Sequence, residues 1–205
     1  VVIKLIPTKN DNFFVGMRLC SIQDNRFAYR KNVLPTSMHP SQAALIVSLA
    51  KPYLKETAQI MDPFCGVGTL LIERAHLVPA REIYATDTYG DAITMGRENA
   101  ALAKTRINFI HRDFFDFRHD YKFDELITDM PVRNRQTKAE MELFYERFFD
   151  KASEHLVSGG IIVMYSNEIG FVKKQIRLRV EYRLLQETCI LDKKDFYLFV
   201  IRYED

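Results

Sequence analysis

Residues 61–71, MDPFCGVGTLL, join an apolar run to a helical pattern and contain an acid and two glycines. At Gly66 and Gly68 the backbone can turn tightly and a ligand can come close, because glycine has no side chain to block it. A dinucleotide-binding turn would have a third glycine at the position of Leu71. Without that glycine the pattern favours S-adenosylmethionine, which has no phosphates and needs an acceptor, here Asp62, near its cationic end.

Acids also follow the next two apolar runs. Asp87 ends EIYATD, where a carboxylate can accept hydrogen bonds from both ribose hydroxyls of a nucleoside. Asp113 can accept from an adenine amino group, and the ring of Phe114 can lie along the adenine. Each acid has an alternative role as a cap of the following helix. Three acids after three consecutive strands, behind a glycine turn, favour the cofactor site over three separate caps.

Strand-like and helical patterns alternate along most of the chain. A helix begins after Pro40 and Ser41. Strands alternating with helices predict a parallel, doubly wound sheet with ligands at the carboxyl ends of its strands. Two final strand patterns, joined by DKKD, predict an antiparallel hairpin. This α/β outline is that of a Rossmann-like, seven-stranded class I methyltransferase sheet. The expected strands are residues 58–62, 82–87, 107–111, 123–129, 159–166, 182–191 and 195–203.

The segment before this sheet predicts a small N-terminal β-hairpin. Residues 13–30 alternate and are interrupted by Asp24 and Asn25, which favour a turn. We therefore expect a strand and hairpin extension over residues 1–35 and a methyltransferase domain over residues 36–205. The chain begins in a strand-like run without methionine, which predicts that it comes from a longer protein.

Composition indicates one globular domain with a sizeable core, since 47% of the residues are hydrophobic and 27% are charged. The net charge of +2 neither demands nor excludes a polyanionic partner. Cys20, Cys65 and Cys189 lack metal-ligand spacing, so we expect no metal and a reducing, cytoplasmic location. No apolar run approaches the ~18 residues that cross a bilayer, so no membrane association is expected.

The motifs DPFCGVGTLLIERA, TD at 86–87, HRDFFDF and TDMPVR together resemble the guanosine-N2 methyltransferases of the THUMP-associated RNA methyltransferase family. The segment LPTSMHPSQAALIVSLA is similar to the family's approach to the first core strand. The resemblance implies a tRNA or rRNA substrate and an N-terminal THUMP RNA-binding domain, which is missing from this chain. It also implies an S-adenosylmethionine site formed by Ser37, His39, Asp62, Cys65, Gly66, Gly68, Thr69, Asp87, Asp113 and Phe114.

The same resemblance implies that Asp129, Met130 and Pro131 form the catalytic loop. The guanine exocyclic amine is a poor nucleophile, so the main task of the enzyme is positioning. The Asp129 side chain and the Met130 carbonyl can accept the two amine N–H groups, and Pro131 stiffens the loop. Asp129 or water can then accept the proton that leaves.

The family pattern continues with an aromatic residue and a glycine, where this sequence has Val132 and Arg133. Valine cannot supply a flat face for a base, an interaction of about 1–3 kcal/mol. Either a different aromatic residue covers the base, or base binding is weak.

Basic residues next to this loop suggest RNA contacts. Arg133, Arg135 and Lys138 follow the loop and can meet phosphates. A second basic cluster over residues 173–179 has the alternative of being a solvated helix face. Cys65 is not expected to be a nucleophile, because no base lies near it in the pattern and a small thiol packs well in a tight turn.

The sequence therefore predicts an S-adenosylmethionine-dependent RNA methyltransferase that modifies guanine N2 in tRNA or rRNA. One alternative is N-methylation of adenine N6 in nucleic acid or of a protein glutamine, because both use related acid-Pro-Pro-aromatic loops. The other is a non-catalytic RNA-binding module that retains the methyltransferase fold.

Overall fold

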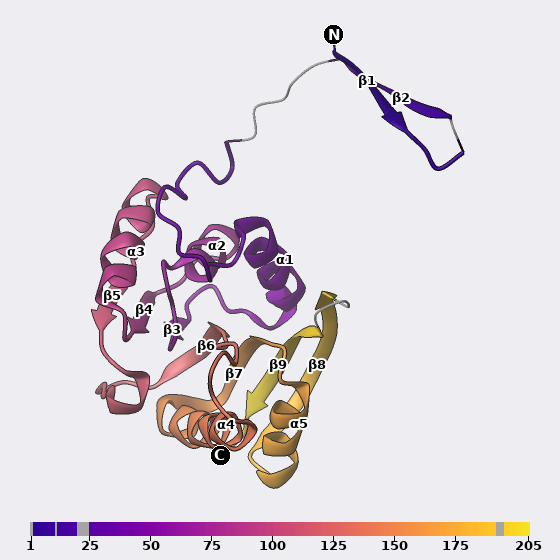
Figure 1. Ribbon diagram of the computed structural model, residues 1–205. Helices are drawn as coiled ribbons and strands as arrows, with labels where there is room; N and C mark the ends of the chain where they lie inside the picture. The colour runs from indigo at the N-terminus through magenta and orange to yellow at the C-terminus, as the bar shows by residue number, and fades with distance from the viewer. Residues whose placement is uncertain (1, 11, 20–24, 192–194) are drawn as a thin grey trace.

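The computed structural model describes residues 2–10, 12–19, 25–191 and 195–205. It contains a two-stranded hairpin and a seven-stranded sheet covered by helices on both faces (Figure 1). The hairpin pairs β1 (Val2–Pro7) with β2 (Phe13–Arg18). The strands of the large sheet are β3 (Gln59–Asp62), β4 (Glu82–Asp87), β5 (Asn108–His111), β6 (Phe123–Asp129), β7 (Leu156–Ser166), β8 (Tyr182–Leu191) and β9 (Phe196–Tyr203).

The large sheet has the strand order β5-β4-β3-β6-β7-β9-β8. β3 to β7 are parallel, whereas β9 pairs antiparallel with both β7 and β8. The predicted seven-stranded sheet with its C-terminal antiparallel hairpin is therefore confirmed. The order reverses between β3 and β6, and ligands of such sheets bind at the carboxyl ends of the strands beside this reversal.

Two apolar clusters lie on opposite faces of the sheet. Successive side chains of a strand point to opposite faces, so neighbouring residues belong to different clusters. Ile60 belongs to one cluster and Met61 to the other. The first cluster packs under α1 (Pro40–Ala50), α2 (Thr69–Leu77) and α3 (Gly90–Leu102).

The second cluster packs under α4 (Lys138–His155) and α5 (Ile169–Leu178). It contains Tyr145, Phe148 and Phe149 of α4, so these aromatic side chains serve core packing. Two short 3-10 helices, η1 (Lys51–Tyr53) and η2 (Phe114–Asp116), complete the helical elements of the described residues.

A buried ion pair joins α2 to β6. The Arg74 guanidinium donates to both carboxylate oxygens of Glu125, at 2.9 and 3.0 Å, and both side chains are almost fully buried. The backbone N–H of Lys55 also donates to Glu125, at 2.8 Å. Since a bidentate pair of this kind has a single preferred geometry, it sets the position of α2 against β6.

The N-terminal hairpin lies elsewhere than predicted. Its turn falls between β1 and β2, where the Thr8 N–H donates to the Asn12 carbonyl at 2.8 Å. Residues 26–29 form turns instead of a second strand, and Asp24 lies outside the described residues. The prediction did not consider that residues 2–7 can pair with residues 13–18.

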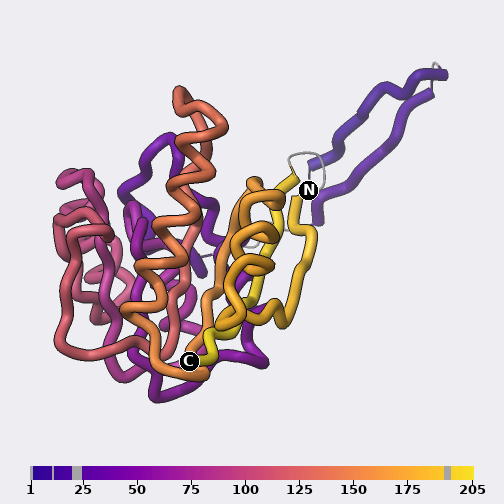
Figure 2. Tube along the Cα trace, turned by 90° about the horizontal axis from the view of Figure 1, so that it is seen from below, coloured from indigo at the N-terminus to yellow at the C-terminus, as the bar shows by residue number. Residues whose placement is uncertain are grey.

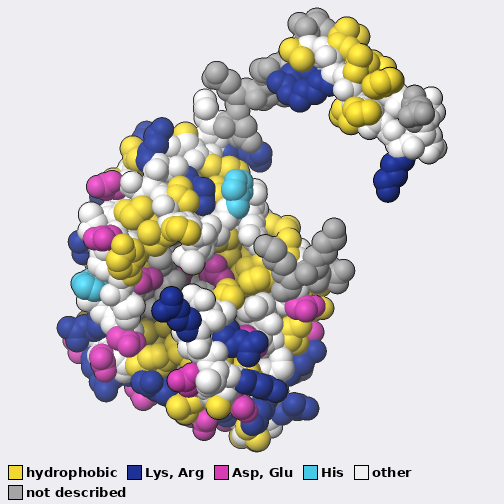
Figure 3. All heavy atoms as spheres, in the orientation of Figure 1, with side chains coloured by type: hydrophobic (Ala, Val, Ile, Leu, Met, Phe, Trp, Pro, Cys, Tyr) yellow, Lys and Arg dark blue, Asp and Glu magenta, His cyan; other side chains and the backbone are white. Residues whose placement is uncertain are grey.

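The hairpin stands away from the main domain in both ribbon and tube views (Figures 1 and 2). Its surface is largely apolar, as Figure 3 shows, with Leu5 and Phe14 both more than 60% exposed. Over the described residues, no helix combines the length and the hydrophobicity needed to cross a membrane.

Candidate active site

A cavity of about 360 Å³ lies at the carboxyl ends of β3, β4 and β6, beside the reversal of strand order. This volume is within the range of small-molecule sites. Four segments line it: residues 34–38, residues 62–70, the end of β4 with the start of α3, and residues 129–132. Of the predicted site residues, it brings together Ser37, Asp62, Cys65, Gly66, Thr69, Asp87, Asp129, Met130 and Pro131.

The two glycines after β3 have different tasks. Both have positive φ, +51° at Gly66 and +78° at Gly68, which favours glycine. A Cβ on Gly66 would meet no atom within 4 Å, and this glycine lines the cavity. A Cβ on Gly68 would come within 2.7 Å of the Phe109 ring. Gly68 therefore allows α2 to begin close to β5, and it does not line the cavity.

Asp87 is held at the edge of the cavity by the backbone. Its Oδ2 accepts from the Gly66 N–H at 2.8 Å, and its Oδ1 accepts from the Tyr89 N–H at 2.9 Å. Each carboxylate oxygen can accept more than one hydrogen bond, so both can still receive ligand hydroxyls. Tyr89 is half exposed and also lines the cavity. The sequence reasoning missed Tyr89, although an aromatic residue two positions after the strand-end acid was a usable signal.

Asp62 is a buried acid, 2% exposed, whose Oδ1 accepts from the Phe64 N–H at 3.0 Å. Burial, with smaller contributions from the negative charges of Asp129 and Asp87, raises the pKa of Asp62 to about 8. Burial also raises the pKa of Asp129 to about 7. A cation bound beside these carboxyl groups would lower their pKa values and restore their charged forms.

Two further residues test whether the cavity fits S-adenosylmethionine. The buried hydroxyl of Thr69 lines the cavity and has no hydrogen-bond partner among the described residues, so it is free for a polar ligand atom. Burial raises the pKa of the Cys65 thiol well above its ordinary value, which agrees with packing and not with a nucleophile. Buried acids for a cation, a tethered acid for ribose and an unpaired hydroxyl fit this cofactor.

Residues 34–38 cover the cavity ahead of α1. The Ser37 hydroxyl accepts from the Leu34 N–H at 2.9 Å, and the Arg30 guanidinium donates to the carbonyls of Ser37 and Met38 at 3.4 and 3.3 Å. Apart from Ser37, this covering segment was not predicted, because its irregular backbone has no periodic signal. His39 lies outside the cavity lining and caps α1, accepting from the Ser41 N–H at 3.3 Å.

Asp113 and Phe114 do not line the cavity, in contrast to the prediction. The Asp113 carboxylate accepts from the Phe115 N–H at 2.9 Å and so caps η2, which is the alternative role open to a strand-end acid. Phe114 is 1% exposed within the cluster under α4. A ring buried on both faces has no surface left for an adenine.

The predicted catalytic loop follows β6 directly. The Met130 N–H donates to the Tyr165 carbonyl at 2.9 Å, which extends the β6–β7 pairing by one bond beyond Asp129. Asp129, Met130, Pro131 and Val132 line the same cavity as Asp62. The polar group of the loop and the proposed cation acceptor therefore face one space.

The predicted RNA-binding residues are not part of the lining of this cavity. Arg133 pairs with Glu168 at 3.9 Å, and Arg135 is exposed. Lys138 lines a second hollow, of about 400 Å³, between α4 and α5. In the second basic cluster, Lys173 pairs with Glu187 at 2.8 Å, Lys174 with Glu142 and Arg179 with Asp150. These pairs favour the solvated face for that cluster.

Comparison with known proteins agrees with the fold and the chemistry. Residues 28–188 match the family described as RMKL-like, methyltransferase domain. A tRNA (guanine(10)-N2)-dimethyltransferase of Methanothermobacter thermautotrophicus is 32% identical over 187 residues, 85% of this chain and 54% of the relative. A release factor glutamine methyltransferase of Lactococcus lactis is 25% identical over 155 residues, 66% of this chain and 56% of the relative. The chain thus spans about half the length of these curated relatives.

Solved structures show the same fold. TrmN from Thermus thermophilus superposes with a TM-score of 0.74 at 21% identity, over 95% of this chain and 57% of that chain. Other structures with this fold contain S-adenosyl-L-homocysteine. The geometry of the cavity fits S-adenosylmethionine, and the family match agrees with it. This chain belongs to the RMKL-like methyltransferase domain family and uses S-adenosylmethionine as its methyl donor.

Proposed function

We propose that this chain is the methyltransferase domain of an RNA methyltransferase that methylates guanine N2 in tRNA or rRNA. The observation that carries the proposal is the shared cavity of Asp129, Met130 and Pro131 with Asp62 and Asp87. The archaeal tRNA guanine-N2 relative supports the choice of guanine. This relative is about twice as long as the region that it shares with this chain. The activity of the whole protein is therefore part of the proposal.

The proposed cofactor contacts follow from the hydrogen-bonding groups of the cavity. Asp62 faces the cationic methionine end, and Asp87 accepts from the ribose hydroxyls. The unpaired Thr69 hydroxyl donates to a polar atom of the cofactor, and Ser37 closes the methionine end. Tyr89 takes the place proposed earlier for Phe114, as the exposed aromatic residue beside the nucleoside.

The proposed catalytic loop orients the nucleophile. The Asp129 carboxylate and the Met130 carbonyl accept the two N–H groups of the guanine amine, which directs its lone pair toward the sulfonium methyl. The new N–C bond forms as the S–C bond breaks, and one amine proton must leave. The Asp129 carboxylate, whose charged form the cationic cofactor favours, or a water molecule can accept that proton. Arg133, Arg135 and Lys138 are proposed to meet RNA phosphates beside the loop.

Transfer of a labelled methyl group to total RNA from cells lacking the protein tests this proposal. With the protein expressed from its full reading frame, nucleoside mass spectrometry should detect N2-methylguanosine. Methyladenosine as the sole product would overturn the guanine assignment in favour of adenine N6. Absence of any methylated product would favour the RNA-binding module.

Replacement of the proposed catalytic acid separates chemistry from cofactor binding. Asp129→Asn should lower the transfer rate by about 100-fold or more, because the side chain can no longer take the proton. Calorimetry should show cofactor affinity within about threefold of the wild type, since Asp62 and Asp87 remain. An equal loss of affinity and rate would mean that Asp129 belongs to the cofactor site.

A further inference from the structure

The loop after β6 leaves one side of the site without a flat surface. Val132 is 51% exposed and lines the cavity, yet it has no ring on which a base could stack. The aromatic residues among the described cavity lining are Phe64 and Tyr89. Tyr89 follows Asp87 on β4, so it belongs to the nucleoside end of the cavity. Phe64 follows β3, the strand that pairs directly with β6.

The ring of Phe64 packs against other aromatic rings. Its centroid lies 5.3 Å from that of Phe144, 6.1 Å from that of Phe148 and 5.9 Å from that of Phe114 in an edge-on contact. Such contacts are individually favourable and hold the ring in one orientation. Phe64 is half-buried and belongs to the lining of the cavity.

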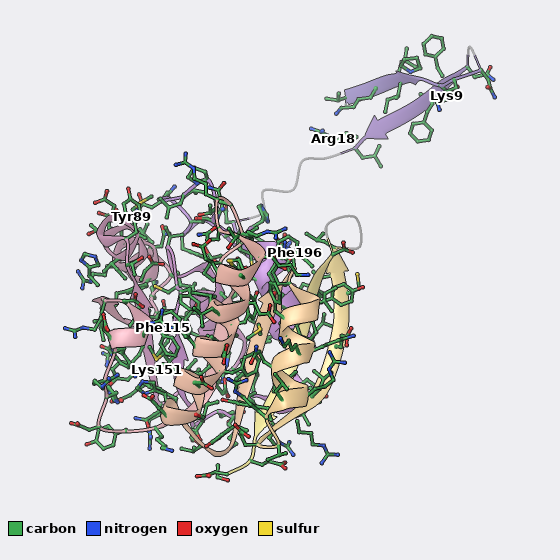
Figure 4. The ribbon with its side chains drawn as sticks, turned by 60° about the horizontal axis from the view of Figure 1, so that its bottom comes forward. Lys9, Arg18, Tyr89, Phe115, Lys151 and Phe196 are labelled. Carbon is green, nitrogen blue, oxygen red and sulfur yellow. The ribbon has the colours of Figure 1, made fainter. Side chains whose placement is uncertain are left out.

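A backbone hydrogen bond and the neighbouring Phe115 ring support this packing further. The Phe64 N–H donates to Asp62 Oδ1, so the backbone of Phe64 is held next to a buried acid of the cavity. Phe115 lies beside α4 (Figure 4), with its ring 5.5 Å edge-on from that of Phe144. The Arg147 guanidinium lies over the Phe115 ring, 4.2 Å from its centroid. A ring with this support loses little conformational entropy when it binds a ligand.

We propose that Phe64 is the stacking residue for the target base, in place of the loop residue at position 132. The inference rests on the proposed function and adds a positioning residue to it. A purine held flat against Phe64 is confined to one plane, with its exocyclic amine turned toward Asp129 and the Met130 carbonyl on the neighbouring strand. Because stacking uses the π-face of the base, Phe64 contributes orientation and affinity, and the hydrogen bonds of the loop contribute the choice of atom.

Three variants of the full-length protein test this role with total RNA as substrate. Phe64→Leu should lower kcat/KM for RNA by about 5- to 150-fold, the loss expected for one base stack. Phe64→Tyr keeps the flat ring and should stay within about threefold of the wild type. Val132→Ala should have a similarly small effect. The cofactor Kd of all three, measured by calorimetry without RNA, should stay within about twofold.

The outcomes separate this inference from the proposed function. Absence of RNA methylation by the wild-type protein overturns the proposed function, and with it the stacking role. An active wild type with an equally active Phe64→Leu overturns the stacking role alone, as does a loss in Phe64→Tyr equal to that in Phe64→Leu. If Phe64→Leu melts well below the wild type, Phe64→Met fills the same space without a ring, and the same loss of kcat/KM is expected.

Discussion

At the scale of single residues, the site depends on acids whose charged forms are disfavoured until a ligand arrives. Burial raises the pKa of Asp62 to about 8, far above the ordinary value for aspartate. The folded protein favours the neutral form of Asp62. The resulting contribution to the free energy of unfolding is fully present below the pKa that Asp62 has in the unfolded chain, and it is lost as the pH rises through about 8. A bound cation reverses this preference, because it stabilises the carboxylate.

This coupling predicts that cofactor affinity increases with pH. Between pH 6 and 8 the Asp62 proton must leave on binding, so the Kd should fall by up to about tenfold per pH unit and level off above pH 8. Calorimetry in buffers of different ionisation enthalpy should detect the released proton. In Asp62→Asn, which keeps the acceptor for the Phe64 N–H, both effects should diminish strongly. A pH-independent Kd in the wild type would contradict the assignment of Asp62 to the cation.

At the scale of elements, the position of α2 depends on the buried pair of Arg74 and Glu125. The pair connects the helix that begins at the glycine turn with the strand that ends at Asp129. Its desolvation is offset only while both partners are present, since a single charge left in the interior is costly. The pair therefore fixes the glycine turn before α2 relative to the proposed catalytic loop after β6.

Removal of one partner should therefore be strongly destabilising. Arg74→Ala should lower the free energy of unfolding by about 3–5 kcal/mol, measured by urea denaturation, because Glu125 would stay buried without its partner. The double replacement Arg74→Met and Glu125→Leu removes both charges and should lose less than Arg74→Ala. A loss below about 1 kcal/mol in Arg74→Ala would show that water reaches Glu125.

At the scale of the whole molecule, the cofactor site joins parts that are far apart in the chain. Residues 34–38, the turn after β3, the end of β4 and the end of β6 all meet around the cavity. Asp87 connects two of these parts through its hydrogen bonds to Gly66 and Tyr89. A ligand that contacts all four parts in the folded state stabilises the fold as a whole.

The cofactor should accordingly raise the melting temperature. At 100 times the Kd, it should add about 2.7 kcal/mol to the free energy of unfolding, detected as a shift in a thermal melt. Asp87→Ala should nearly abolish the shift, because it removes the ribose acceptor and the tether of the glycine turn. Glu146→Ala, at an exposed position of α4 outside the cavity lining, is a control that should keep the full shift. An unchanged shift in Asp87→Ala would remove this residue from the cofactor site.

The sequence by itself determined the alternation of strands and helices, the terminal hairpin and the acids Asp62, Asp87 and Asp129. These features have local signals, since hydrophobic periodicity and an acid at the end of a strand can both be recognised within a short stretch of sequence. The N-terminal turn was misplaced for a related reason: several apolar runs could pair, and pairing is a non-local choice.

Only the tertiary structure decided which strand-end residues face the cavity. Asp113 and Phe114 follow a strand just as Asp87 does, yet the first caps η2 and the second packs under α4. Likewise, only the tertiary structure packs Phe64 against Phe144 and Phe148 and places it in the same cavity lining as residues 129–132. The direction of a side chain depends on what other elements place around it, and contacts between distant residues leave no local pattern in the sequence.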